Sequence, residues 1–177
     1  LEEVRKLSEF LKEENGLEFL YLGYHCDINS DEMDLLARAI SSNKTLTSFG
    51  VKSFSDHGNG LISFAKALKH NNSLTDLRLN IGYILKKLDV EFAALEESIS
   101  SNYSLTSLDM KGCNMSKEIK NNIQSSLQRN GQITDTIDNY FGLILVPKIM
   151  KALDEDEKMS GDFDPPIRDV REVMKKE

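Results

Sequence analysis

A short phrase that recurs at nearly constant spacing constrains this chain more than any other feature of its sequence. The phrase reads Leu-Thr-x-Leu or a close variant and begins at residues 46, 74 and 105, with a weaker copy at 17 and a decayed one at 133. Successive copies are therefore 28 to 31 residues apart. A repeat of this length is one supersecondary unit that cannot bury its apolar face alone, so neighbouring units are expected to stack around a shared core.

The residues before each phrase predict a helix that ends in a turn. Apolar residues stand ten and six positions upstream of every copy, and a spacing of four puts both on one face of a helix. An Asn stands three positions upstream of the last four copies, and we expect it to end each helix in the left-handed conformation that Asn tolerates. The upstream positions hold Leu7, Leu36, Phe64, Leu95 and Ile123, then Leu11, Ile40, Leu68, Ile99 and Leu127, then Asn43, Asn71, Asn102 and Asn130.

The copy that starts at Leu105 carries a resemblance to a known family. Residues 105–115 fit the pattern L-x-x-L-x-L-x-x-[N/C]-x-L at every fixed position when Met is allowed for Leu. With its 28-residue period, the chain resembles leucine-rich repeat proteins of the ribonuclease-inhibitor type over residues 1 to 138. The resemblance implies an α/β solenoid, a short horseshoe with a parallel sheet on its concave side and helices on its convex side.

The first three copies depart from this family pattern at its Asn/Cys position. The residues there are His25, Phe54 and Gly82. We therefore expect the Asn ladder of the family to be mostly absent and the loops that follow the strands to be irregular.

The patterns divide the chain into three predicted segments. Residues 1–136 form a repeat array of about five units, 137–153 form a helical C-terminal cap, and 154–177 form an acidic linker with a short terminal helix. Within the cap, Pro147 either kinks one helix or begins a second at its first turn. An edge strand from Tyr140 to Val146 is the alternative to the helical cap.

Charge and composition exclude some classes of partner. The chain has 22 Lys and Arg against 29 Asp and Glu, a formal charge of −7, which argues against nucleic acid because phosphate binding needs a basic surface. The longest apolar run, Tyr140–Val146, is too short to span a bilayer. Two cysteines cannot form a disulfide framework, so we expect a reducing compartment, which is the cytoplasm, or a host cytosol if the chain is a bacterial effector. We also expect a monomer. The start at Leu1, without Met or an apolar signal segment, is typical of a fragment or a processed form.

The sequence predicts no catalytic, metal or cofactor site. Cys26 and Cys113 fall in the first and fourth copies, so stacked strands about 4.8 Å apart separate them by about 14 Å, beyond the roughly 7 Å that a disulfide tolerates. No Cys-x-x-Cys or His-x-x-x-His pair suggests zinc. No glycine-rich phosphate loop or Gly-x-Ser-x-Gly elbow occurs, so an enzyme is not supported.

Four Asn-x-Ser/Thr sequences raise the question of glycosylation. They begin at Asn43, Asn71, Asn102 and Asn114. Three of the four are the repeated Asn followed by its own Ser or Thr, so the repeat accounts for them without a sugar.

The alternation of side chains along a strand predicts where a ligand would dock. If the phrase's first, fourth and sixth positions face the core, its third, fifth and seventh positions line the concave sheet. That surface has an aromatic end and a charged remainder, and aromatics and Arg are enriched at interface hot spots. The alternative is that Phe19 and Tyr21 only cover the flank of the first repeat. The predicted partner-binding residues are Phe19, Tyr21, Lys52, Asp76, Arg78, Asn80, Asp109 and Lys111.

Three functional hypotheses follow. The chain is a protein-binding module that grips another protein on its concave face, which is also the usual function that the family resemblance implies. Alternatively, five repeats with a helical end resemble the actin-capping domain of tropomodulin, which implies a cytoskeletal role. A third hypothesis makes the chain the targeting or sensor part of a larger receptor or bacterial effector.

Overall fold

A computed structural model describes residues 2–13, 16–23, 28–52, 59–80, 88–111, 114–140, 143 and 146–159. The chain divides into two units, Leu1–Ile133 and Thr134–Glu177, and each is described by itself.

The first unit contains a four-stranded parallel sheet whose strands lie in chain order. Residues at the same position of the repeat are paired across the sheet, so that Tyr21, Gly50, Arg78 and Asp109 form one row. The register confirms that the copies at 17, 46, 74 and 105 occupy successive rungs of one stack. The strands are β1 (Phe19–Leu22), β2 (Ser48–Val51), β3 (Asp76–Asn80) and β4 (Ser107–Lys111).

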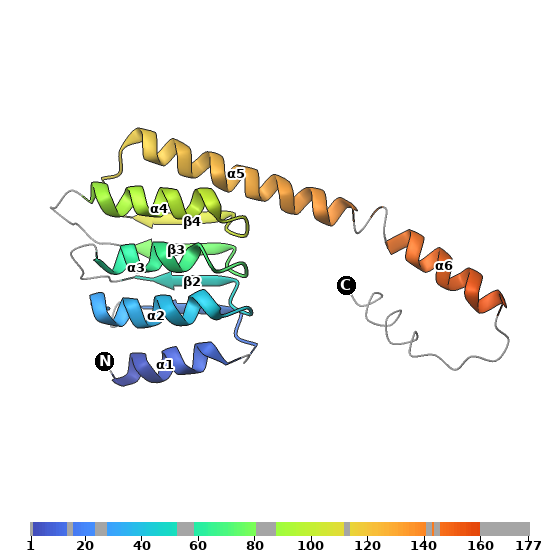
Figure 1. Ribbon diagram of the computed structural model, residues 1–177, viewed down its shortest axis with the longest axis horizontal. Coiled ribbons are helices and arrows are strands. Elements are labelled where there is room, and N and C mark those ends of the chain that lie inside the picture. The colour runs from blue at the N-terminus through green and yellow to red at the C-terminus, as the bar shows by residue number, and fades with distance from the viewer. Residues whose placement is uncertain are drawn as a thin grey trace. The chain divides into compact units, whose positions relative to one another are not determined.

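Helices alternate with these strands and form a second layer against the sheet (Figure 1). Consecutive helices from α1 to α4 pack side by side. A capping box, in which the Asn29 side chain accepts from the Glu32 N–H and Glu32 accepts from the Asn29 N–H, begins α2. The helices that the structure describes in this layer are α1 (Glu2–Lys12), α2 (Ser30–Ser42), α3 (Asn59–Leu68), α4 (Asp89–Ser101) and α5 (Lys117–Asn139).

The apolar positions of the repeat form one core between the two layers. Leu36, Phe64 and Leu95, ten positions upstream of their phrases, are fully buried, as are the first residues of the phrases. The rings of Phe49 and Phe64 stack with their centroids 5.4 Å apart, which links β2 to α3. Each buried Leu or Phe contributes roughly 1.5–3 kcal/mol. The fold is thus an α/β stack of leucine-rich-repeat type, as the sequence predicted.

The repeated Asn ends helices, but not in the conformation that we expected. Asn43 follows α2 with φ −71° and ψ 138°, and Asn102 follows α4 with φ −91° and ψ 138°. No described residue other than glycine has a positive φ. The prediction of a left-handed cap is therefore wrong: the backbone is already extended at Asn and leads directly into the strand.

The buried Asn side chains instead join neighbouring repeats. Asn71 Nδ2 donates to the carbonyl oxygens of Ile40 at 2.7 Å and Asn43 at 3.0 Å, both in the preceding unit. Its Oδ1 accepts from the backbone N–H of Ser73 at 3.1 Å and of Leu74 at 2.8 Å, in its own unit. The side-chain amide of Asn71 therefore stabilises the turn that leads into its own strand, and it also holds that turn against the previous unit.

This arrangement repeats along the stack. Asn43 donates to Leu11 O at 2.6 Å, and Asn102 donates to Leu68 O and Asn71 O at 2.8 Å each. We call the set Asn43, Asn71, Asn102 and Asn130 the buried Asn column. The buried Asn column stands at the turn between each helix and the strand that follows it. The Asn/Cys position of the family pattern is a different one, because it comes after the strand in the sequence. Residues 25, 54 and 82, which hold that position in the first three copies, fall outside the described residues. Because Asn43, Asn71 and Asn102 are only 3–5% exposed, the folded chain has no room for a sugar on them.

The fifth copy supplies a helix and an Asn but no strand. Helix α5 runs through Asn130 and Ile133 to Asn139 without a break, so the prediction that Asn130 ends a helix is wrong. Asn130 is nonetheless fully buried, and its Nδ2 donates to the carbonyl oxygens of Asn102 at 3.0 Å and Leu105 at 2.7 Å. The fifth copy therefore closes the buried Asn column without extending the sheet.

The second unit contains helix α6 (Val146–Met159). Pro147 is its second residue, so of the two alternatives for this proline the structure has a helix that begins there. Tyr140 and Leu143 do not belong to a strand. Helix α5 continues past residue 136, and α6 continues past residue 153, so neither predicted segment boundary coincides with the end of a helix. The division into three segments remains a prediction, and residues 160–177 lie outside the described ones.

Candidate functional site

The sheet face opposite the helices carries the predicted docking residues. We call it the open sheet face. Its two aromatic side chains are among the most exposed large apolar groups of the first unit, with Phe19 at 69% and Tyr21 at 56%. Strand alternation predicted this orientation correctly, because the intervening Phe49, Leu77 and Leu79 are buried. The described side chains of the open sheet face come from the third, fifth and seventh positions of the phrase: Phe19, Tyr21, Ser48, Gly50, Lys52, Asp76, Arg78, Asn80, Ser107 and Asp109.

The ring of Tyr21 lies across strand β2 at Gly50. A methyl group on Gly50 would overlap Cδ2 of Tyr21 and would come within 2.7 Å of its Cε2. It would also contact Cβ of Arg78 at 3.5 Å. Gly50 therefore provides the space in which the ring of Tyr21 lies. It stands between that ring and Arg78, where the aromatic end of the face meets the charged centre.

Asp76 is the centre of a polar network that joins three strands. It accepts from Ser48 Oγ at 3.0 Å on β2 and from Arg78 Nε at 2.9 Å on its own strand, and also from Ser107 on β4. Partial burial raises the pKa of Asp76, but the hydrogen bonds from Ser107, Ser48 and Arg78, with the charge of Arg78, outweigh it and hold the pKa below its usual value. Asp76 is therefore an ionised group that orients Arg78 and is poorly suited to proton transfer at neutral pH.

An open hollow of about 310 Å³ lies beside this network. Tyr21 stands at one end and Asp109 at the other, with Arg78 between them in the same row of the sheet. Most of the predicted docking residues thus meet at one place. The hollow is lined by Tyr21, Val51, Lys52, Arg78, Leu79, Asn80 and Asp109.

The other predicted residues lie around the hollow or cannot be placed. Asp76 does not line the hollow itself but holds Arg78, which does. Phe19 stands two residues before Tyr21 on β1. Lys111 pairs with Asn80 in the sheet, but its side chain is outside the described residues. Sequence reasoning put Ser48, Gly50 and Ser107 on this face without giving them a role. Their small size was the available signal, because it leaves room for the ring of Tyr21 and the carboxylate of Asp76.

The arrangement is suited to binding. It combines an aromatic surface, a guanidinium held by a carboxylate, and a second carboxylate at Asp109. Among the described residues, no group of three His, Cys, Asp or Glu is gathered as metal ligands would be. His25, Cys26, His57 and Cys113 lie outside the described residues, so the predicted separation of the cysteines remains a prediction. Nor does the described part of the chain contain a helix with the length and apolarity to cross a membrane.

Comparison with known proteins gives similarity of fold. No family model matches the chain, and no curated protein does. Among solved structures, the chain is similar to leiomodin-1 actin-binding site 2, with a TM-score of 0.64, 19% identity, and coverage of 90% of this chain and 82% of that one. It is also similar to the tropomodulin C-terminal domain of Caenorhabditis elegans at 15% identity, covering 75% of this chain and 96% of that one, with a TM-score of only 0.40. The first similarity supports the leucine-rich-repeat type of fold, and the second is too low to support an argument.

Proposed function

We propose that this chain is a non-catalytic protein-binding module whose partner docks on the open sheet face. The observation that carries the proposal is the hollow in which Tyr21, Arg78 and Asp109 meet. Exposed aromatic and Arg side chains at the centre of a surface are typical of interface hot spots. The network around Asp76 supports the proposal, because a guanidinium held in place loses less freedom when a partner binds.

The proposal includes the finer predictions about this chain. It acts without catalysis, cofactor or metal, binds neither nucleic acid nor membrane, and works as a monomer in the cytoplasm or in a host cytosol. Its repeats are of the ribonuclease-inhibitor type, which is supported by full helices of 10 to 13 residues in α2, α3 and α4 between strands one repeat apart. The anchors of the interface are Phe19, Tyr21, Arg78 and Asp109.

Affinity purification with a double variant tests the docking surface. Wild-type chain and a Tyr21→Ala, Arg78→Ala variant are used as bait for cell extract, and the recovered proteins are quantified by mass spectrometry. Losing two hot-spot side chains costs on the order of 2–4 kcal/mol of binding, so the partner recovered by the wild type is expected to be lost.

The control is an Arg5→Ala, Phe10→Ala variant, which removes the same kinds of exposed side chain from α1. It is expected to recover the partner as the wild type does. Equal recovery by the sheet-face variant and the wild type would show that the partner docks elsewhere.

A second candidate function is binding to actin, favoured by the similarity to leiomodin-1 actin-binding site 2. The full chain, added to pyrene-labelled actin, is expected under this reading to change filament growth. Unchanged kinetics across a range of chain concentrations would dismiss it.

The third hypothesis, a targeting or sensor part of a larger receptor or effector, is tested by the parent reading frame. A frame that continues well beyond Leu1 or Glu177 would favour it, and a native start and stop at these residues would count against it.

A further inference from the structure

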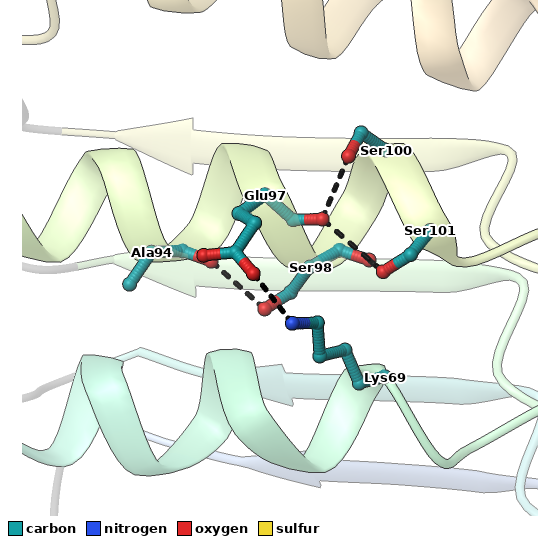
Figure 2. Close-up of polar contacts among 6 residues, drawn as sticks. All are labelled: Lys69, Ala94, Glu97, Ser98, Ser100 and Ser101. Atoms are coloured by element: carbon teal, nitrogen blue, oxygen red, sulfur yellow. Dashed lines mark hydrogen bonds and ion pairs between the residues drawn. The ribbon is translucent and has the colours of Figure 1, made fainter.

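The seams between consecutive helices are closed differently along the stack. Between α3 and α4, Lys69 Nζ bonds Glu97 Oε1 at 2.6 Å, from the turn directly after α3 to the middle of α4 (Figure 2). The hydrogen bond from Lys69, together with its charge, lowers the pKa of Glu97. Between α4 and α5, Asn122 Nδ2 donates to Glu96 Oε1 at 2.7 Å. Both of these seams are therefore crossed by a side-chain bond to a carboxylate.

The seam between α2 and α3 has the wrong residues for such a bond. The positions equivalent to Lys69 and Glu97, five and eight residues before the next phrase, hold Ser41 and Lys66 here. A hydroxyl and an ammonium cannot form an ion pair, and Ser41 Oγ already donates to the Arg38 carbonyl at 2.8 Å. Lys66 is exposed and forms no ion pair or hydrogen bond within the part of the chain that the structure describes.

A groove of about 260 Å³ remains open at this seam. Its small, buried alanines, Ala37 and Ala67, are 1% and 5% exposed and let the two helices approach closely. Arg38, Lys66 and His70 bring basic groups to it, while one carboxylate, Asp34, is 2.6 Å from Arg38. The lining residues are Asp34, Ala37, Arg38, Ser41, Ser63, Lys66, Ala67 and His70.

The groove is therefore a local basic site on a chain whose formal charge is −7. We infer that it binds an acidic segment of a partner protein, with a carboxylate of that segment beside Ser41, in the place that the Lys69 ammonium occupies in the next seam. Lys66 supplies the positive end of the ion pair, and the Arg38 guanidinium, which pairs with Asp34, and the His70 ring lie beside it as further hydrogen-bond donors.

The length of the groove fits a peptide. From Asp34 to Ser41 the lining spans two helical turns, or about 10 Å, which an extended peptide covers with about three residues. Because the site lies on the helices, it is separate from the open sheet face and does not depend on the function proposed for that face.

Fluorescence anisotropy with an acidic peptide tests the inference. The probe is a fluorescein-labelled hexapeptide of alternating Asp and Glu, titrated with the full chain at low ionic strength, where exposed charge pairs are least screened. Wild type is expected to bind, and Lys66→Glu is expected to weaken binding about tenfold, since it removes an attraction and adds a repulsion. A Ser41→Lys, Lys66→Glu double variant copies the closed seam of α3 and α4 and is expected to lose binding while keeping the helical signal in circular dichroism.

The matched control is Lys120→Glu, which makes the same charge change at an exposed position of α5. It is expected to bind within about twofold of the wild type. The inference is overturned if the wild type does not bind, or if Lys66→Glu and Lys120→Glu weaken binding equally. It is also overturned if inorganic phosphate at the peptide's concentration displaces the probe, or if a single-stranded oligonucleotide of equal charge binds more tightly. Unchanged probe binding by the Tyr21→Ala, Arg78→Ala variant would separate this site from the open sheet face.

Discussion

Asn71 holds two repeats together with one side chain. Its amide group donates two hydrogen bonds to the preceding unit and accepts two from its own, in surroundings that leave it 3% exposed. Spacing showed that an Asn recurs, but not this role. Local preference for the left-handed conformation was the only rule available, and bonds to a neighbouring repeat are invisible within one copy.

A substitution at this residue tests its role. Asn71→Ala leaves buried carbonyl and N–H groups without partners and is expected to lower the free energy of unfolding by about 3 kcal/mol. Urea denaturation followed by circular dichroism measures the change. Asn72→Ala, one residue further along and exposed, is expected to cost under about 0.5 kcal/mol. Equal effects of the two substitutions would contradict the role of the buried Asn column.

Gly50 is expected to matter only because of Tyr21. Gly50→Ala would push the ring off β2, and we expect a loss of about 1–3 kcal/mol in the free energy of unfolding. In a Tyr21→Ala background the added methyl has space, so the same substitution is expected to cost under about 0.5 kcal/mol. A double-mutant cycle of denaturation curves measures the coupling, and a coupling near zero would argue against the contact.

Asp76 predicts a dependence of stability on pH. Because its pKa in the folded chain lies below the ordinary value of 3.8, its ionised form stabilises the fold. That contribution is present above the unfolded pKa and is lost as the pH falls through the folded one. The difference in free energy of unfolding between wild type and Asp76→Asn is therefore expected to be larger at pH 6 than at pH 3. A difference that stays constant or grows towards pH 3 would show that the carboxylate is not stabilised in the fold.

At the scale of elements, the helices and strands of the first unit followed the repeat closely. Leu36 and Ile40, for example, are both fully buried on α2, as a spacing of four predicted. The course of α5 did not follow. The phrase at 133 carries a trace of the strand pattern, yet residues 132–139 are all exposed on a continuous helix. This copy has Asp138 at the position where the other copies have Leu, Val or Met, so a strand here would place a carboxylate toward the core.

Two isoleucines on α5 separate its buried half from its exposed half. Ile123 is 5% exposed and Ile133 is 37% exposed. Ile123→Ala is expected to lower the free energy of unfolding by about 3 kcal/mol, and Ile133→Ala by under about 1 kcal/mol. Thermal or urea denaturation measures both. The reverse order would mean that α5 covers the stack with a different face.

At the scale of the whole chain, the sequence predicted which face of the sheet is open but not how its side chains cooperate. Alternation along the strands is enough to place Tyr21, Arg78 and Asp109 outside the core. The position of the Tyr21 ring over Gly50 and the orientation of Arg78 by Asp76 depend on the register between strands. The open groove between α2 and α3 became visible only when equivalent helix positions could be compared in space.

Hydrogen–deuterium exchange on the chain, free and bound to the partner that affinity purification recovers, tests the central claim most directly. If that partner docks on the open sheet face, protection on binding is expected in the peptides that contain β1 to β4, with the exchange of α2, α3 and α4 unchanged. Protection confined to the helices, with the strands exchanging as in the free chain, would contradict the claim.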